Sequence, residues 1–138
     1  MNKICTSIEQ SKKLIELGID VNMADMYWFN RHIDLTETKY ELFIVDKSDK
    51  TIDFFNSYAV AVEKDEIIPA WSLSALLGLI PDKIVVNNEN YFLNFTKKRV
   101  EYRGRITWDG QKCISKEAEN LLDAIFEMVC WLKENKNI

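Results

Sequence analysis

Charged side chains at alternate positions are the feature of this sequence best suited to binding chemistry. One parity of the segment 97–108 is charged and comprises Lys97, Arg99, Glu101, Arg103 and Arg105. The other parity is mainly apolar and comprises Val100, Tyr102, Ile106 and Trp108. In a β-strand these two sets lie on opposite faces. With the adjacent turn residue Lys98, the charged face is suited to nucleic-acid phosphates or an acidic protein. The alternative is a solvated outer sheet face whose charges discourage edge-to-edge aggregation.

Aromatic residues offer a second kind of contact. The sequence has four tryptophans, five tyrosines and seven phenylalanines, and Tyr27, Trp28 and Phe29 are consecutive. Aromatic side chains are enriched among the anchors of protein interfaces, although they also fill cores. Tyr27, Trp28 and Trp131 are the interface candidates, Trp131 because it lies off the main apolar stripe of its predicted helix. Self-association through such a patch would give a symmetric dimer.

Catalytic and metal-binding motifs are not recognisable. His32 is the single histidine, and the cysteines Cys5, Cys113 and Cys130 are far apart with no CxxC pair. We therefore expect no metal, no cofactor and no disulfide framework. Cys130 and His32 form a conceivable nucleophile and base, but Cys130 lies near the C-terminal end of a predicted helix, where the dipole disfavours a thiolate. An enzyme or small-ligand binder remains an alternative, which would need a pocket around His32 or several carboxylates.

Composition limits the class of protein. The chain has 138 residues, of which 47% are hydrophobic and 29% charged, and its net charge is −4. This is a globular mix of one-domain size, and the acidic balance argues against a globally basic nucleic-acid binder. The unpaired cysteines suit a reducing cytoplasm, and the N-terminus lacks the apolar core of a signal peptide. The longest weakly polar stretch, residues 67–80, is shorter than the roughly 20 residues of a membrane span. We expect a soluble cytoplasmic protein with no membrane partner.

Periodicity and capping signals predict the elements that position these residues. Helices are predicted over residues 6–17, 69–80 and 115–134. Strands are predicted over residues 38–45, 51–63, 83–87, 91–95 and 99–107. Asp109-Gly110 is a strong turn signal. Residues 19–37 are ambiguous. Asp20 or Asn22 could cap a short helix through Met23–Met26, and the run Tyr27-Trp28-Phe29 has no clean helical or strand period.

Helices and strands are segregated rather than regularly alternating along the chain, which predicts an α+β fold. We expect residues 1–138 to form a single α+β domain. Its antiparallel sheet would have four or five strands, with N-terminal, central and C-terminal helices packed mainly on one face.

Four stretches resemble a group of short uncharacterised proteins of gut bacteria, often found in prophage-like or other mobile DNA. They are Glu9–Leu14, Ala24–Met26, Ile68–Leu77 and Leu122–Lys133. The resemblance extends over most of the chain in the same order and implies a small α+β protein. The group has no assigned function, so it transfers no catalytic or binding residue. A mobile-element context would favour an accessory or regulatory role.

The leading hypothesis is a non-catalytic intracellular accessory or regulatory protein that acts through protein–protein interaction. Its partner would be another protein or a second copy of the chain. The alternative is nucleic-acid binding through the strand face of Lys97, Lys98, Arg99, Arg103 and Arg105.

Overall fold

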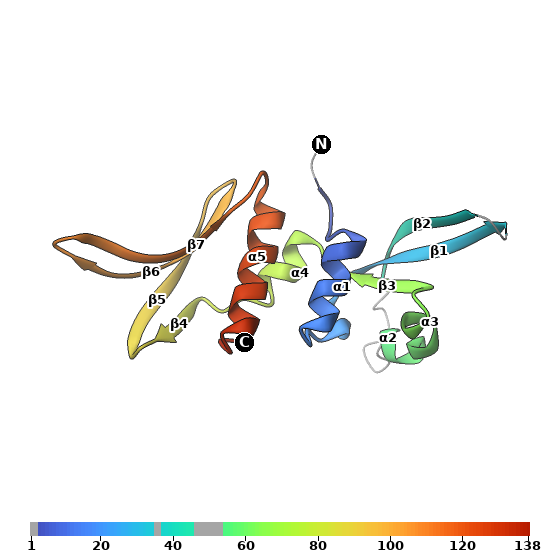
Figure 1. Cartoon of the computed structure of the whole chain (residues 1–138), viewed down its shortest axis with the longest axis horizontal. Helices are drawn as coiled ribbons and strands as arrows, with labels where there is room; N and C mark the ends of the chain where they lie inside the picture. The colour runs from blue at the N-terminus through green and yellow to red at the C-terminus, as the bar shows by residue number, and fades with distance from the viewer. Residues whose placement is uncertain (1–2, 35–36, 46–53) are drawn as a thin grey trace. The chain divides into compact units, whose positions relative to one another are not determined.

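The computed structural model describes residues 3–34, 37–45 and 54–138 of the chain, which forms two compact units. The N-terminal unit is Cys5–Ala75, and the C-terminal unit is Leu76–Ile138 together with Met1–Ile4. Figure 1 shows a sheet and helices in each unit. The predicted α+β class is confirmed. The strands are divided between a three-stranded and a four-stranded antiparallel sheet, whereas the sequence pattern predicts one sheet.

The three-stranded sheet of the N-terminal unit has β1 (Met26–Asp34) at its centre, between β2 (Glu37–Ile44) and β3 (Ile67–Ala70). On one face of β1, Met26 and Trp28 pack with Cys5 and other buried residues. On the opposite face, Tyr27 contacts the rings of two helical phenylalanines. Apolar side chains are thus required on both faces of β1, which is why the run Tyr27-Trp28-Phe29 shows no strand alternation in the sequence.

Helix α1 (Ile8–Glu16) begins where the capping signals predict it. The Ser7 hydroxyl accepts a hydrogen bond from the Gln10 backbone N–H, and the Gln10 side chain accepts one from the Ser7 backbone N–H. Behind this cap, the Thr6 Oγ1 accepts the backbone N–H of Trp71 at 3.0 Å and contacts the Ser11 hydroxyl at 2.8 Å. These buried hydrogen bonds connect the start of α1 to the chain that follows β3.

One predicted element is wrong and another is correct only in part. Within the predicted strand 51–63, the described residues form two short helices, α2 (Phe54–Ser57) and α3 (Ala59–Glu63), because the phenylalanine rings of α2 pack on Tyr27 of the sheet. In the predicted helix 69–80, residues up to Ala70 belong to β3, and only α4 (Leu73–Leu77) is helical. Pro69 is accepted there because β3 is an edge strand, where a missing N–H is tolerated. A 3₁₀ turn, Val21–Met23, completes the N-terminal unit.

The four-stranded sheet of the C-terminal unit is a meander. Its order is β4 (Lys83–Val86), β5 (Glu89–Phe95), β6 (Arg99–Thr107) and β7 (Gly110–Glu117). The first three strands lie where the sequence predicts them. The β4–β5 turn is made by Asn87 and Asn88, both at positive φ, as two-residue hairpins prefer.

Strand β7 is not predicted by the sequence, and it displaces the start of the C-terminal helix. Helix α5 (Leu121–Glu134) begins six residues after the predicted Ser115, because Ser115 is paired with Glu101 in the sheet. The Asn120 side chain caps it by accepting the Asp123 N–H at 2.8 Å. α5 contacts β6 and β7, and its apolar face is buried with Val100 and Tyr102 of β6, so one face of this sheet forms the core of the unit.

Candidate functional site

The face of the four-stranded sheet opposite Val100 and Tyr102 is here called the outer face. Cross-strand pairing assigns its members. They are Lys83 and Val85 of β4; Asn90, Phe92 and Asn94 of β5; Arg99, Glu101, Arg103 and Ile106 of β6; and Gln111, Cys113, Ser115 and Glu117 of β7. Apart from Glu101 and Asn94, every member is exposed to solvent. The outer face therefore presents a mixed cationic and apolar surface.

Glu101 is the buried centre of the outer face, with only 6% of its surface exposed. The Arg103 Nε donates to Glu101 Oε1, the Arg99 Nε lies 3.9 Å from Oε2, and the Asn94 amide donates to Oε1 at 3.4 Å. Burial alone would raise the pKa of the Glu101 carboxyl. The Arg103 hydrogen bond and the charges of Arg103 and Arg99 outweigh it, so that pKa is lowered. Glu101 stays ionised and holds an arginine on each side.

Phe92 lies directly opposite Arg103 on the neighbouring strand. Its ring is 57% exposed although it belongs to the second strand of a four-stranded sheet. Lys83 is opposite Phe92 on the other side, so the ring lies between two cationic positions. An exposed ring flanked by cations is a surface suited to stacking and to cation–π contact.

A β-bulge between Arg103 and Ile106 changes the predicted order of charges along β6. Gly104 and Arg105 together take the place of one residue, so Ile106 rather than Arg105 continues the outer face opposite Gln111. The sequence predicts Arg105 on the charged face and Ile106 on the apolar one, and the bulge reverses both. Within the described residues, Lys97, Lys98 and Arg105 form no ion pair.

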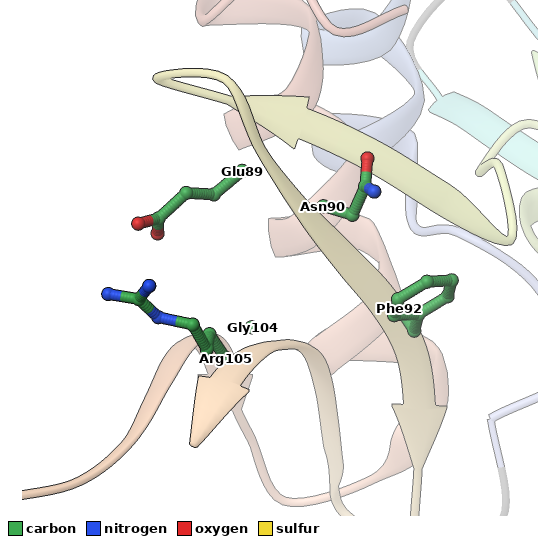
Figure 2. Close-up of a pocket in the computed structure, with 5 residues that line it drawn as sticks. All are labelled: Glu89, Asn90, Phe92, Gly104 and Arg105. Atoms are coloured by element: carbon green, nitrogen blue, oxygen red, sulfur yellow. The ribbon is translucent and has the colours of Figure 1, made fainter. Parts of the chain in front are cut away.

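A shallow hollow of about 300 Å³ lies at this bulge, between β5 and β6. Glu89, Asn90 and Phe92 line it from β5, and Gly104 and Arg105 line it from β6. Figure 2 shows the side chains of Glu89 and Arg105 extending toward one another, away from the Phe92 ring. The Glu89 carboxylate also lies 3.3 Å from the Lys112 Nζ. The hollow is thus a shallow depression at the bulge, and its two charged residues, Glu89 and Arg105, are not members of the outer face.

Among the described residues of the C-terminal unit, the most exposed large hydrophobic side chains lie at the tip of the β6–β7 hairpin. Trp108 is 96% exposed and Ile106 is 76% exposed. The turn between Thr107 and Gly110 is closed by a bond from the Thr107 hydroxyl to the Gly110 carbonyl at 2.9 Å, and Gly110 takes φ +122°. The sequence pattern groups Trp108 with the apolar face of Val100 and Tyr102, and does not identify it as a contact residue. The Asp109-Gly110 turn signal could have done so, because it places Trp108 in the turn.

The aromatic candidates of the N-terminal unit are tied into its fold. The Trp28 Nε1 donates to the Thr6 carbonyl at 3.1 Å, and its ring packs against the cluster of Cys5, Met26 and Ala70. Tyr27 stacks on Phe43 with the ring centroids 5.5 Å apart. Burial, followed by the nearby Tyr58, raises the pKa of Tyr27. Both side chains are half-buried and carry internal contacts.

The remaining candidates are placed separately. Trp131 lies on α5 and is half-buried, and its neighbour Cys130 is buried. Cys113 is exposed on the outer face. His32 belongs to β1, but its side chain lies outside the described residues. Among the residues that the structure describes, no group of three or more His, Cys, Asp and Glu side chains could hold a metal ion.

Charge is distributed unevenly between the two units. The N-terminal unit has 13 acidic and seven basic residues, whereas the C-terminal unit has nine acidic and 11 basic residues. Within the C-terminal unit, residues 97–116 contain seven basic and two acidic residues, a net charge of +5. The β6–β7 hairpin is therefore a local cationic surface in an acidic chain, which favours contact with anionic partners.

Comparison with known proteins assigns the chain to no family. The chain matches no protein family, no curated protein and no solved structure. In the described part of the chain, none of the helices has the length and hydropathy needed to cross a bilayer.

Proposed function

We propose that this protein is a non-catalytic accessory protein that binds another protein, with the β6–β7 hairpin tip as its anchor. The observation that carries the proposal is the exposure of Trp108, 96%, beside the exposed Ile106. A fully hydrated indole at a turn contributes nothing to the core, whereas tryptophan is enriched at the centres of protein interfaces. Burial of the two side chains in an apolar pocket of a partner would supply the main apolar contact.

The residues around the tip support a protein partner. Asp109 lies next to Trp108 in the turn, and a carboxylate at this position is unfavourable inside a bilayer, by about 3 kcal/mol at its centre. Ile106 cannot stack on a base, so the pair fits an apolar pocket better than a nucleobase. Arg105 and Lys112 flank the tip and are suited to an acidic rim around that pocket. The partner is either a different protein or a second copy of this chain.

The test combines mass measurement with crosslinking in cells. Light scattering after size exclusion first determines whether the wild-type chain self-associates, and whether Trp108→Ala abolishes any dimer. Gln111, exposed opposite Ile106, is then replaced by the photo-crosslinker p-benzoylphenylalanine in the full chain. We expect a discrete protein adduct that is lost in the Trp108→Ala background. Once identified and purified, this partner should bind Trp108→Ala at least about 30-fold more weakly, which corresponds to roughly 2 kcal/mol.

Trp28→Phe is the control variant, because Trp28 is a fold residue of the other unit and its replacement should leave the adduct unchanged. The proposal fails if crosslinking at Gln111 gives no protein adduct. It also fails if the same adducts form with Trp108→Ala, since the indole would then not be the anchor.

A further inference from the structure

We infer that the outer face of the four-stranded sheet binds single-stranded nucleic acid, with a base stacked on Phe92 and phosphates on Arg103, Arg99 and the turn lysines. The contact residues of this site, Phe92, Arg99, Arg103 and the turn lysines, do not include the tip residues Trp108 and Ile106, from which the bulge after Arg103 separates them. The inference does not rest on the proposed protein partner.

Cationic side chains supply the electrostatic attraction for phosphates at this site. Lys97 and Lys98 are exposed in the β5–β6 turn, and neither makes an ion pair with another described residue. Arg99 and Arg103 extend this charge along β6, a strand of nine residues or about 30 Å. A linear row of cations matches a linear polyanion, and each neutralised phosphate releases counterions.

The Phe92 ring supplies the surface on which a base would stack. The ring is directly opposite Arg103 and more than half exposed on a face that no described helix covers. Unpaired bases present their flat faces to such a ring, whereas the bases of a duplex are stacked on one another. The site should therefore prefer single strands to duplexes, and should show little sequence preference.

Glu101 gives the face a fixed geometry. Its buried carboxylate takes the Nε of Arg103 and lies within 3.9 Å of the Nε of Arg99. Arg103 contacts Glu101 through its Nε, so within the described residues its two terminal nitrogens remain available as phosphate donors. An arginine held at Nε loses little side-chain freedom when it binds, which favours an outward-facing bidentate contact.

The experiment is fluorescence anisotropy of a labelled 20-nucleotide oligothymidine titrated with the full chain. At 150 mM NaCl we expect a dissociation constant of about 1–100 μM, the range of non-specific nucleic-acid binding at physiological salt. Four cationic contacts predict a slope of about −2.8 in log K against log salt, so that affinity falls about 50-fold between 50 and 200 mM NaCl. A 20-base-pair duplex and poly-L-glutamate serve as competitors, and both should compete weakly.

Three variants locate the site. Phe92→Ala removes the stacking ring without removing a hydrogen bond and should weaken binding about 5- to 150-fold. Lys97→Gln with Lys98→Gln should reduce the salt slope by about half. The charge-matched control is Lys39→Gln with Lys64→Gln, two exposed lysines of the N-terminal unit, which should change neither quantity. Trp108→Ala should bind oligothymidine within about twofold of wild type, because the indole is not one of the four cationic contacts or the stacking ring.

Each other outcome overturns the inference. No anisotropy change at 100 μM protein, or binding that does not depend on salt, removes the site altogether. Equal competition by duplex contradicts base stacking, and equal competition by polyglutamate assigns the face to an acidic protein. Phe92→Ala is checked by circular dichroism. If it is folded and binds like wild type, or if the control lysines matter as much as Lys97 and Lys98, the site is not on this face.

Discussion

In the three-stranded sheet the aromatic side chains contact one another, whereas in the four-stranded sheet two of the largest project into solvent. Tyr27, Phe43 and Phe54 form a chain of ring contacts with centroids 5.2 and 5.5 Å apart. In the other sheet, Phe92 is 57% exposed and Trp108 is 96% exposed. The charges differ as well, because the unit with packed rings is acidic, whereas the β6–β7 hairpin, which carries Trp108 and lies beside Phe92 of β5, is cationic. Exposed apolar surface beside cations is what a binding surface requires, whereas mutually packed rings stabilise a fold.

Replacing one tryptophan in each unit tests this difference most directly. Trp28→Ala should lower the free energy of unfolding by about 2–4 kcal/mol, because it deletes a half-buried ring and leaves the Thr6 carbonyl without its donor. Trp108→Ala should change it by less than about 0.5 kcal/mol, as expected for a surface position. The measurement is urea unfolding followed by circular dichroism at 222 nm, which does not depend on the fluorescence of the replaced residue.

Trp28→Phe refines this first prediction. It keeps one aromatic ring but loses the five-membered ring of the indole and its Nε1–H, so it should cost less than Trp28→Ala, about 1–2 kcal/mol. If Trp108→Ala proves as destabilising as Trp28→Ala, Trp108 is packed in solution and the distinction between the two sheets does not hold.

A smaller effect is expected from Gly104, where the inner side of the second sheet is tightly packed. A Cβ at this position would lie 2.6 Å from the Cε1 atom of the Tyr91 ring. Gly104→Ala should therefore destabilise the protein by about 1–3 kcal/mol, the usual cost of overpacking. The same substitution in a Tyr91→Ala background should cost less, since the clash is removed. Equal costs in the two backgrounds would show that the ring is not the obstacle.

The sequence predicts the fold well where local signals decide, and poorly where tertiary packing does. The start of α1 near residues 6–7 and the range of β6 are both confirmed. β1 is ambiguous in the sequence because both of its faces are covered, and β7 is missed because its polar residues resemble the start of a helix. For the candidate site, alternation places Arg99, Glu101 and Arg103 correctly on one face, whereas Lys97 lies in the turn before β6. It fails at Arg105, because a bulge is set by strand pairing and leaves no clear mark in the residue pattern.

The buried hydroxyl of Tyr102 provides a pH-dependent test of the C-terminal unit. It donates to the Pro81 carbonyl at 2.7 Å, and burial, together with the charge of Asp82, raises the pKa of Tyr102 to about 12. A tyrosine in the unfolded chain titrates near pH 10. The folded state thus holds the proton more tightly, so its stabilisation is complete below pH 10 and is lost as pH rises toward 12.

Tyr102→Phe keeps the ring but removes the hydroxyl, and with it both the hydrogen bond to Pro81 and the pH-dependent stabilisation. At pH 8 it should lower the free energy of unfolding by about 1 kcal/mol, because the Pro81 carbonyl loses its donor. Between pH 10 and 12 the wild type should lose stability relative to the variant, so the two urea midpoints converge. A constant difference across this range would mean that Tyr102 ionises as easily in the folded protein as in the unfolded one.

The smallest effect is expected at Glu101, and it has the opposite pH dependence. The arginines on either side lower the pKa of Glu101, so the stabilisation is present above about pH 4.3, where an unfolded glutamate ionises, and is lost as pH falls through the folded value. Glu101→Gln should cost about 0.5 kcal/mol at pH 7, since both arginines are nearly half exposed and water screens the pair. Thermal melts at pH 7 and pH 3 test this, and the gap between wild type and variant should close at the lower pH. If the gap instead persists at pH 3, the side chain stabilises the outer face through packing rather than charge, and the two arginines are not held by an ionised carboxylate.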